Sequence, residues 1–397
     1  MSGMKLKTLL LGAAAAATAT TAQAADLPVA PEPVDYVRIC DAYGSRYYYI
    51  PGTETCLRVG GRVRTQFVVN NVQDDGDWSG RDDDGYSWLS RGYVYLESQT
   101  ETEFGTLRTY TSIYATNTNG TNSVTLDAAY IQWGNVVAGR AGSNFNIYTG
   151  QVFVGVVTRD WSDATMNQIA YTAAFGSGFS ATIALEDRSG REVGDYGGTR
   201  APDLVGALAI SQGWGSAQIS GALHQVYPDD AAANQGTNSA DESLGWAIGA
   251  GVNINLPFAN SGSNVYFQGF YADGALSYIG NGITDSDFGA TDYAVNSDDT
   301  NTGYSLSAGL YIQATPTVGL AVDGSYAHVD ADVANLTSGV DDIDRWAIDG
   351  SVQWSPASGF VLGADVGYSN TEINDVDPDD DDSLEELLFG VRLQRTF

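Results

Sequence analysis

Apolar and polar residues alternate along this chain from Cys56 to its last residue. Segments of about ten residues carry apolar side chains on one face and polar side chains on the other, which is the period of a β-strand between two different surroundings. The alternation predicts sixteen strands, near residues 57-70, 88-100, 106-115, 124-133, 136-142, 166-175, 179-186, 203-212, 216-226, 243-255, 264-272, 302-313, 318-328, 344-354, 360-368 and 386-397.

The connections between these strands alternate between short and long. Short turns are expected at 103-105, 134-135, 176-178, 213-215, 257-263, 315-317 and 355-359. Mostly long loops are expected at 71-85, 116-123, 143-165, 187-202, 227-242, 273-301, 329-343 and 369-385. An up-and-down barrel with one rim on each side of a membrane requires this segregation, whereas a soluble β-sandwich gives no reason for it. The pattern therefore predicts an all-β fold, a sixteen-stranded antiparallel transmembrane β-barrel.

The first predicted strand shows what its two faces contact. Val59 and Val63 lie on one face, and Arg58, Arg62 and Arg64 lie on the other. Because three arginines on one face cannot point into lipid or a dry core, this face is expected to line water. Sixteen strands also enclose a lumen too wide for side chains to fill. Glutamines take the same inward parity on many strands, namely Gln66, Gln132, Gln168, Gln218, Gln268, Gln313, Gln353 and Gln394.

The apolar face indicates lipid contact, because aromatic residues recur on it near strand ends, as they do at membrane interfaces. The first five strands have fewer outward aromatics and more small residues. We interpret this thinner belt as an interface between subunits.

The two ends of the chain carry export signals. Lys5 and Lys7 precede an apolar run, and Ala22-Gln23-Ala24 is a small-x-small cleavage site, so residues 1-24 are predicted to be a secretory signal peptide. Residues 25-56 are then a periplasmic N-terminal segment and residues 57-397 the barrel. The last strand ends in Phe397 after alternating apolar residues. In many outer-membrane proteins this pattern is the C-terminal signal that the insertion machinery recognises.

The formal net charge of −31 excludes nucleic acid as a probable partner, because phosphate binding needs a basic surface. A hydrophobic content of 43% argues against an acidic disordered chain. The acidic excess lies in the predicted long loops, at Asp74-Asp75, Asp82 to Asp84, Asp229-Asp230, Asp298-Asp299, Asp341-Asp342 and Asp379 to Asp382. These loops are interpreted either as solvated charge or as sites for divalent cations that bridge to lipopolysaccharide.

Cys40 and Cys56 are the two cysteines of the chain. In an oxidising periplasm, a pair so close in sequence is expected to form a disulfide; two unpaired thiols are the alternative. With His224 and His328 as the two histidines, metal binding by the cysteines is disfavoured, and no cofactor is expected.

The segment from Val37 to Gly61 closely resembles the porin family of alpha-class proteobacteria. Its most specific sequence motifs are Cys40-Asp41-Ala42-Tyr43-Gly44 and Cys56-Leu57-Arg58-Val59-Gly60-Gly61. Phe104 to Tyr110 and the Gly139-Arg140 step add to the likeness. The resemblance implies a trimeric general porin, in which the third loop, Ser143 to Thr165, folds into the lumen.

A pore constriction needs a charged wall and a loop that faces it. By parity, inward arginines are expected to form the wall, namely Arg58, Arg62, Arg64, Arg91, Arg108, Arg140 and Arg392, unless some of them pair with wall carboxylates such as Glu97. On the loop, Asp160 and Asp163 are the carboxylates that would oppose the wall. Acidic vestibules attract cations and the arginines attract anions, and the sequence favours cations only weakly.

The predicted function is passive diffusion of small hydrophilic solutes and ions through an outer-membrane channel, not catalysis. A substrate-selective channel is the nearest alternative, because Tyr93, Tyr95, Tyr110, Tyr114 and Tyr130 take the inward parity and offer a track for sugars. A barrel hydrolase would need a base such as the inward His224, with Ser220 on the same face. An adhesive barrel is opposed by the hydrophilic lumen.

Overall fold

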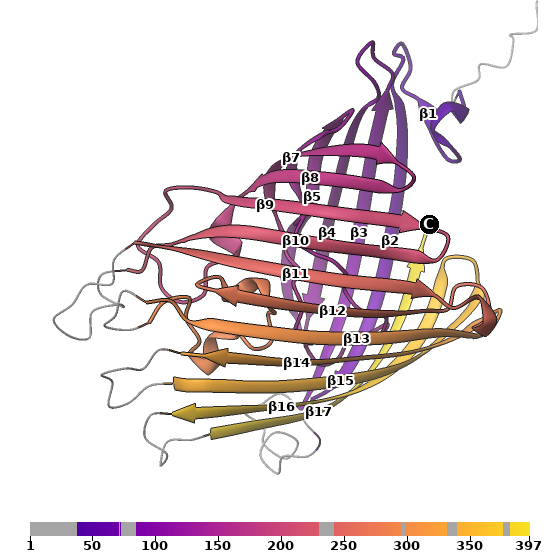
Figure 1. Cartoon of the computed structure of the whole chain (residues 1–397). Helices are drawn as coiled ribbons and strands as arrows, with labels where there is room; N and C mark the ends of the chain where they lie inside the picture. Colours follow the sequence, from indigo (N-terminus) through magenta and orange to yellow (C-terminus); the bar gives the residue numbers. More distant parts are fainter. Residues whose placement is uncertain are drawn as a thin grey trace, which may run out of the picture.

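The computed structural model describes residues 38–70, 72, 85–229, 242–294, 299–331, 340–375 and 382–397. Sixteen strands form the barrel (Figure 1). They are β2 (Cys56–Val69), β3 (Tyr86–Thr100), β4 (Leu107–Thr118), β5 (Thr121–Trp133), β6 (Val136–Gly142), β7 (Thr165–Gly176), β8 (Phe179–Glu186), β9 (Asp203–Gln212), β10 (Gly215–Val226), β11 (Ser243–Asn255), β12 (Asn264–Asp273), β13 (Thr302–Thr315), β14 (Val318–Asp330), β15 (Val340–Ala357), β16 (Phe360–Asp375) and β17 (Asp382–Thr396).

The barrel closes by antiparallel pairing of its last strand with its first. In β17, Thr396 lies opposite Arg62 of β2, and Phe389 lies opposite Val69. All other neighbours along the chain also pair antiparallel, including β6 with β7 and β9 with β10. Because a closed sheet pairs every backbone group within the membrane, no edge is left in hydrocarbon. The predicted all-β, sixteen-stranded antiparallel barrel is confirmed. Among the described residues, no helix has the length and apolar character needed to cross a membrane.

Loop length separates the two rims largely as predicted. In Figure 1 the short turns between β11 and β12, β13 and β14, and β15 and β16 lie at one end of the barrel, and the loop between β12 and β13, with its short helices, lies at the other. One expectation is wrong: 116-123 is not a long loop, because β4 and β5 continue to Thr118 and Thr121 and join through Asn119 and Gly120 alone. These two residues have φ values of 48° and 89°, and Asn-Gly is the pair that a tight hairpin turn with positive φ favours.

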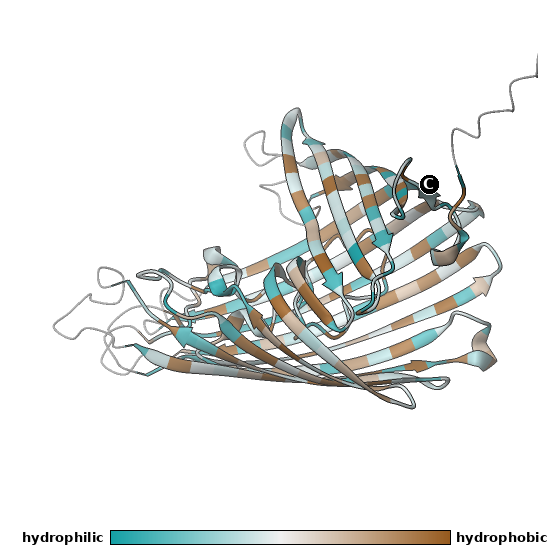
Figure 2. Ribbon diagram, turned by 90° about the horizontal axis from the view of Figure 1, so that it is seen from above, coloured by the Kyte–Doolittle hydropathy of each residue, from teal (hydrophilic) through white to brown (hydrophobic). Residues whose placement is uncertain are grey.

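Side chains alternate between the outer surface and the interior along every strand, which Figure 2 shows as alternating brown and teal. Large apolar residues such as Ile169, Leu208 and Leu306 are exposed on the isolated chain. Lipid covers such residues in a membrane barrel. Rings pair near the strand ends, as Trp246 and Tyr271 do with centroids 5.4 Å apart. This outer surface fits the lipid contact predicted from the sequence.

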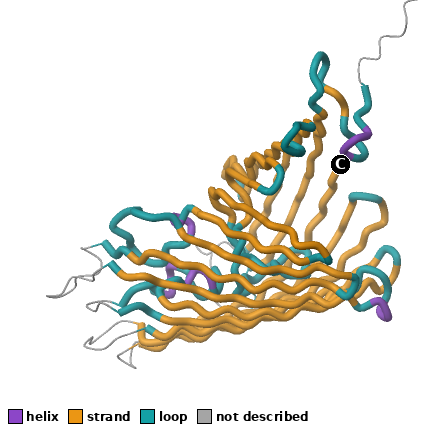
Figure 3. The backbone as a smooth tube through the Cα atoms, turned by 45° about the horizontal axis from the view of Figure 1, so that its top comes forward, coloured by secondary structure: helices purple, strands orange, loops and turns teal. Residues whose placement is uncertain are grey.

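The interior is only partly open, which the sequence did not indicate. Loop 3 (residues 143–164), loop 4 (187–202) and loop 6 (274–301, described except for 295–298) fold inward over the strands from β7 to β15. They contain the short helices η2 (Arg188–Gly190), η4 (Leu276–Tyr278) and η5 (Ser286–Phe288), which lie at the loop-bearing end (Figure 3). Together with inward side chains they form a hydrophobic core inside the barrel, with members that include Phe145, Trp161, Val193, Ala184, Ala222, Ala247, Phe270, Leu276, Ile279, Ala327 and Ile343.

This core, which we call the packed half, corrects the expectation that water fills the whole lumen. Its inward strand positions are mostly small, such as Ala184, Ala222 and Ala247, so the loops have room to bury apolar residues against them. The open part of the lumen therefore lies beside β2–β5.

The N-terminal segment forms a small disulfide-linked hairpin at the start of β2. It contains η1 (Asp41–Tyr43) and β1 (Tyr48–Tyr49), which pairs with Cys56 and Leu57. Cys40 and Cys56 form a disulfide, as predicted, and both are buried together with Tyr47. A further short helix, η3 (Pro257–Ala259), lies in the turn between β11 and β12.

Some predictions fall outside the described residues. These are the signal peptide at 1-24, most of the N-terminal lead-in, and the acidic positions 74-75, 82-84, 230, 298 and 379-381. The division into signal peptide, periplasmic segment and barrel stays a prediction.

Candidate pore constriction

Loop 3 leaves the wall after β6 and is anchored at its base by Glu186 at the end of β8. The Glu186 carboxylate accepts hydrogen bonds from Ser143 Oγ at 2.6 Å and from the Asn144 backbone N–H at 2.8 Å. The Ser143 N–H also donates to Ala164 O at the other end of the loop, at 2.9 Å. These bonds close the base of the loop and direct residues 145–162 into the barrel.

Carboxylates on β14, β15 and β16 hold the far part of the loop through its backbone. Asp323 accepts from the N–H groups of Gln151 and Val152 at 2.6 and 2.8 Å. Asp365 accepts from the N–H groups of residues 154 and 155 at 2.7 and 3.0 Å, and Asp349 accepts from residue 156 at 2.8 Å. Charge-assisted bonds of this kind are strong. Loop 3 therefore crosses the lumen, as the family resemblance implied, and lies along the wall from β12 to β17.

Two inward glutamines extend this support. Gln268 accepts from the Tyr148 N–H at 3.0 Å and donates to Tyr148 O at 2.9 Å, so it binds both backbone polar groups of Tyr148. Gln218 donates to the carbonyl oxygens of Asn144 and Asn146. The polar parity of these glutamines was predicted, but their role is to hold the loop rather than to face open water.

Asp160 does not oppose the arginine wall. It is fully buried, and its carboxylate lies 2.7 Å from Arg345 Nη1 and accepts from the Ile283 N–H at 2.7 Å. Arg159 likewise pairs with Asp349, at 3.1 Å. Burial makes an ion pair necessary, because an isolated charge in this packed half would be strongly destabilising. The partners on β15 follow loop 3 by more than 180 residues.

Asp163 is exposed at the end of loop 3, beside the packed half. The cation that acts on it is Arg191 of loop 4, not a member of the predicted wall. The expected pairing of loop carboxylates with wall arginines is therefore absent for both Asp160 and Asp163.

Three inward arginines stand on the open side without a carboxylate. Arg62, Arg64 and Arg91 form no salt bridge within the described part of the chain. They stack on tyrosines instead: Arg62 lies 5.2 Å from the Tyr93 ring centroid, and Arg91 lies 4.3 Å from that of Tyr114. We call this group the arginine–tyrosine wall, made of Arg62, Arg64, Arg91, Tyr93, Tyr95 and Tyr114.

Neutral hydrogen bonds hold the wall in place. Arg64 donates to Gln394 Oε1 at 3.1 Å, and Arg91 donates to Thr116 Oγ1 at 2.8 Å. Because these partners carry no charge, they orient the guanidinium groups and leave their positive charge uncompensated.

Other predicted wall arginines are already paired. Arg58 and Arg108 share Glu97, and Arg108 Nε lies 2.6 Å from its carboxylate. This pairing was the alternative considered for the sequence. Arg392 donates to Gln66 and to the carbonyl oxygens of Phe153 and Val154, so it also holds loop 3.

Arg140 lies on the outer face, contrary to the parity assigned from the sequence. In the register it lies opposite Ala129 and Asn167, in the same set as the exposed Ile131 and Ile169. Its Nε donates to Leu126 O at 3.0 Å. The short β6 offers few residues from which to read the alternation.

Sequence reasoning missed the carboxylates that hold loop 3, namely Asp323, Asp349 and Asp365. Each stands alone among apolar and small residues on a predicted strand, at an inward position. An isolated inward carboxylate on a strand indicates that it needs a partner, and this signal is present in the sequence. The partner is the backbone of loop 3, and no local sequence pattern predicts the path of that loop.

His224 belongs to a buried network in the packed half. Its Nδ1 lies 2.9 Å from Asp203 Oδ1 and its Nε2 lies 3.1 Å from Tyr196 Oη. Asp292 accepts from Tyr196 Oη at 2.7 Å and from the backbone of loops 4 and 6, and burial raises the pKa values of both Asp292 and Tyr196. His224 and Ser220 are fully buried, so the arrangement joins loops to strands and presents no base to a substrate.

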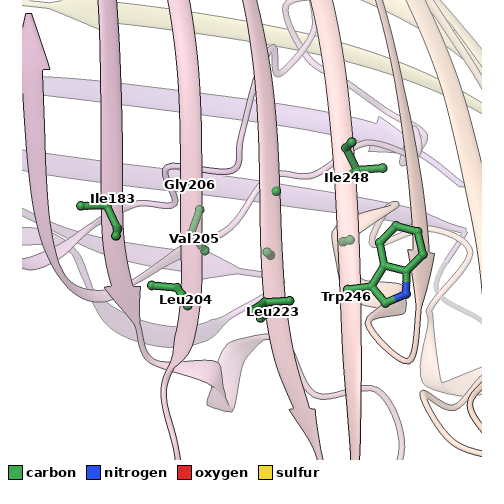
Figure 4. Close-up of a pocket in the computed structure, with 10 residues that line it drawn as sticks. Ile183, Leu204, Val205, Gly206, Leu223, Trp246 and Ile248 are labelled. Carbon is green, nitrogen blue, oxygen red and sulfur yellow. The ribbon is translucent and has the colours of Figure 1, made fainter.

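Two outer-surface features lie apart from the lumen. A hollow of about 460 Å³ surrounds the paired Gly206 and Gly221, with Leu204, Leu223 and Trp246 at its edge (Figure 4). Its rim residues are the exposed, lipid-facing ones, so it is not part of the channel. At the outer ends of β14 and β15, donor atoms of His328, Asp342 and Asp344 lie within 4.8 Å of one another.

A closed barrel with lipid-facing and water-facing sides, an inward loop and a charged wall defines an outer-membrane channel. The family model described as Porin subfamily matches residues 26–387, and the chain belongs to that family. Porin Omp2b of Brucella suis biovar 1 (strain 1330) is 40% identical over 286 residues, which cover 65% of this chain and 77% of that protein. Porin Omp2b of Brucella abortus (strain 2308) gives the same values.

Solved structures support the fold. The outer-membrane channel DcaP of Acinetobacter baumannii has a TM-score of 0.66 at 15% identity and covers 88% of this chain and 99% of its own. OmpT of Vibrio cholerae, in its trimer form, has a TM-score of 0.55 at 10% identity and covers 87% of this chain and 100% of its own. The protein is thus a porin of the Gram-negative outer membrane, through which small solutes diffuse passively, and the family consists of channels rather than enzymes.

Proposed function

We propose that solutes pass between loop 3 and the arginine–tyrosine wall, and that the channel favours small anions at this narrowest point. The observation that carries the proposal is the charge asymmetry across the gap. Arg62, Arg64 and Arg91 have no carboxylate partner in the described residues, whereas the carboxylates behind loop 3 are capped by its backbone N–H groups.

Distance decides between this wall and the acidic outer loops. Charges separated by more than about 8 Å are largely screened at physiological ionic strength. The outer acidic residues therefore raise the cation concentration at the mouth, but the unpaired guanidinium groups act on an ion that is inside the constriction. This reverses the weak preference for cations inferred from the sequence.

The tyrosines favour ions over sugars as preferred solutes. A sugar track needs free aromatic faces, but guanidinium groups lie over the rings of Tyr93, Tyr95 and Tyr114, at 4.3 to 5.9 Å from their centroids. Arg108 lies over Tyr110 and Tyr130 in the same way, at 5.7 and 5.6 Å. The rings hold the arginines, and a selective sugar channel is the weaker candidate.

The test is the reversal potential of single channels in a planar bilayer under a salt gradient. The parent channel is expected to prefer chloride over potassium, and the double variant Arg62→Gln/Arg64→Gln to lose much of that preference. Arg395→Gln is the matched control, because Arg395 lies at the periplasmic rim and donates to Ser358 O. An unchanged reversal potential in the double variant would remove these residues from the constriction, and saturation by oligosaccharides would favour the sugar channel.

A homotrimer is part of the same proposal. The strands β2–β6 carry small outward residues such as Ser98 and Thr109, whose hydroxyl groups lie 2.6 Å apart, between two aromatic clusters at the strand ends, Phe67 with Tyr86 and Trp88, and Phe104 with Trp133. Outer-membrane lipid covers the rest of the outer face. Lipopolysaccharide phosphates meet that face near His328 and Asp344, where a bridging divalent cation would relieve the repulsion between carboxylate and phosphate.

A further inference from the structure

The N-terminal hairpin is part of the channel wall rather than a lead-in beside it. Tyr47 is buried against inward residues: Gln99 Nε2 donates to its hydroxyl at 2.8 Å, and Arg58 lies 5.0 Å from its ring centroid. Both partners belong to the polar face of the barrel. The hairpin thus reaches the lumen at the periplasmic end of β2 and β3.

A hollow of about 140 Å³ lies where the hairpin meets the barrel. It is lined by the hairpin residue Arg46, by residues of β2, β3 and β4, and by the end of the chain, namely Arg46, Arg58, Val59, Gly60, Tyr95, Glu97, Tyr110, Thr396 and Phe397. Its size suits a small solute ion rather than a sugar or a peptide.

When Arg108, which shares Glu97, is counted, three guanidinium groups and two carboxylates surround the hollow, and this excess of one positive charge favours an anion. Arg46 and Arg58 supply two guanidinium groups, while Glu97 is buried and is already shared between Arg58 and Arg108. The remaining negative group is the C-terminal carboxylate of Phe397, which accepts a hydrogen bond from the Gly61 N–H at 3.0 Å. Arg46 forms no salt bridge with the described residues, so its donors are available to a ligand.

The backbone of the hairpin is constrained at Arg46. Arg46 has a φ of 72°, in the region that favours glycine, and its neighbour Gly44 has a φ of 100°. The turn is closed by the Cys40–Cys56 disulfide and by the hydrogen bond from the Cys40 N–H to Tyr47 O, at 2.9 Å. A residue other than glycine keeps such a backbone conformation only where its surroundings impose it.

We propose that the disulfide-linked hairpin places Arg46 opposite Arg58 to form a binding site for small anions at the periplasmic exit of the channel. The site rests on the proposed anion preference, since it would receive ions that have passed the arginine–tyrosine wall. Phosphate and short carboxylates are the ligands of fitting size and charge.

The test measures block of chloride current by inorganic phosphate, added to one side of oriented channels at a time. Phosphate is expected to block at a several-fold lower concentration from the periplasmic side, and Arg46→Gln is expected to abolish this difference. Arg38→Gln is the matched control, because Arg38 lies on the same hairpin but stacks on Tyr49, 4.4 Å from its centroid, outside the hollow. The double variant Cys40→Ser/Cys56→Ser should behave as Arg46→Gln does.

The two proposals fail separately. A cation-selective reversal potential in the parent channel would overturn the proposed function. Equal phosphate block in the parent, Arg46→Gln and Arg38→Gln channels would overturn the exit site, whatever the reversal potential. If the cysteine variant does not fold, the Arg46 and Arg38 variants still decide the question.

Discussion

The two sides of this barrel interior use the same inward strand positions in opposite ways. From β2 to β5 these positions hold arginines and tyrosines that stack on one another and leave positive charge facing the passage. From β7 to β15 many of them hold small residues such as Ala184, Ser220 and Ala247, and loops 3, 4 and 6 pack on them. The contrast shows that the size of inward residues, and not only their polarity, decides where a wide barrel stays open.

Charge follows the same division. In the packed half, buried ion pairs join loop 3 to β15, with Arg345 paired to Asp160 and Arg159 paired to Asp349. On the open side, Arg62 and Arg91 rely on rings and neutral hydrogen bonds. Water near the open side solvates a guanidinium group, so a counter-charge is not required there.

Breaking a pair in the packed half is expected to have the largest effect. Arg345→Met leaves Asp160 buried without its partner, which should lower the free energy of unfolding by about 3–5 kcal/mol. Urea unfolding from lipid vesicles, followed by tryptophan fluorescence, measures the loss. Arg395→Met at the exposed rim is the control and should cost less than about 1 kcal/mol. A loss of similar size in both variants would show that the packed half does not depend on the pair.

On the open side, the Glu97 carboxylate reduces the positive electrostatic potential of the lumen. Glu97→Gln releases Arg58 and Arg108 and adds one net positive charge to the wall. A charge at about 7 Å in water is worth about 0.6 kcal/mol, and it acts with opposite sign on chloride and potassium, so the chloride-to-potassium permeability ratio should rise about sevenfold at low salt. Reversal potentials test this. Glu101→Gln, in the exposed turn between β3 and β4, makes the same charge change and should alter the ratio less.

The smallest expected effect concerns the start of loop 4. Asp187 caps η2 by accepting from the Ser189 N–H at 3.1 Å, and this backbone hydrogen bond lowers its pKa. Asp187→Ala should therefore destabilise the protein by about 0.5–1 kcal/mol at neutral pH. Because a lowered pKa stabilises the fold only while the carboxylate is ionised, the difference between parent and variant should vanish as the pH falls through that lowered pKa. A difference that persists in acid would contradict the capping role.

Much of the fold could be predicted because alternation is a local signal. The bounds 179-186, 203-212 and 243-255 coincide with β8, β9 and β11, where both faces are clear. The Asn119-Gly120 pair is a signal for a tight turn. The polar residues on both sides of it resemble a loop, and for this reason a loop was predicted at 116-123.

The candidate site was less predictable, because its contacts join distant parts of the chain. The parity of Arg62, Arg64 and Arg91 could be assigned from neighbours on their own strands. Asp160 could not be placed, because its partner Arg345 is 185 residues away. Inward alanines were equally ambiguous, because a small side chain is compatible with water and with a packed loop.

Loop 3 is attached to the barrel through its backbone, which leaves its side chains free to vary. Asp323, Asp349 and Asp365 bind backbone N–H groups, and every residue type except proline supplies one. Apart from Gly155, whose φ of 66° favours glycine, substitutions between residues 151 and 156 can therefore change the width and chemistry of the aperture while the attachment of the loop to the barrel is kept. A lineage that carries this scaffold can retune what it admits through one short stretch of sequence.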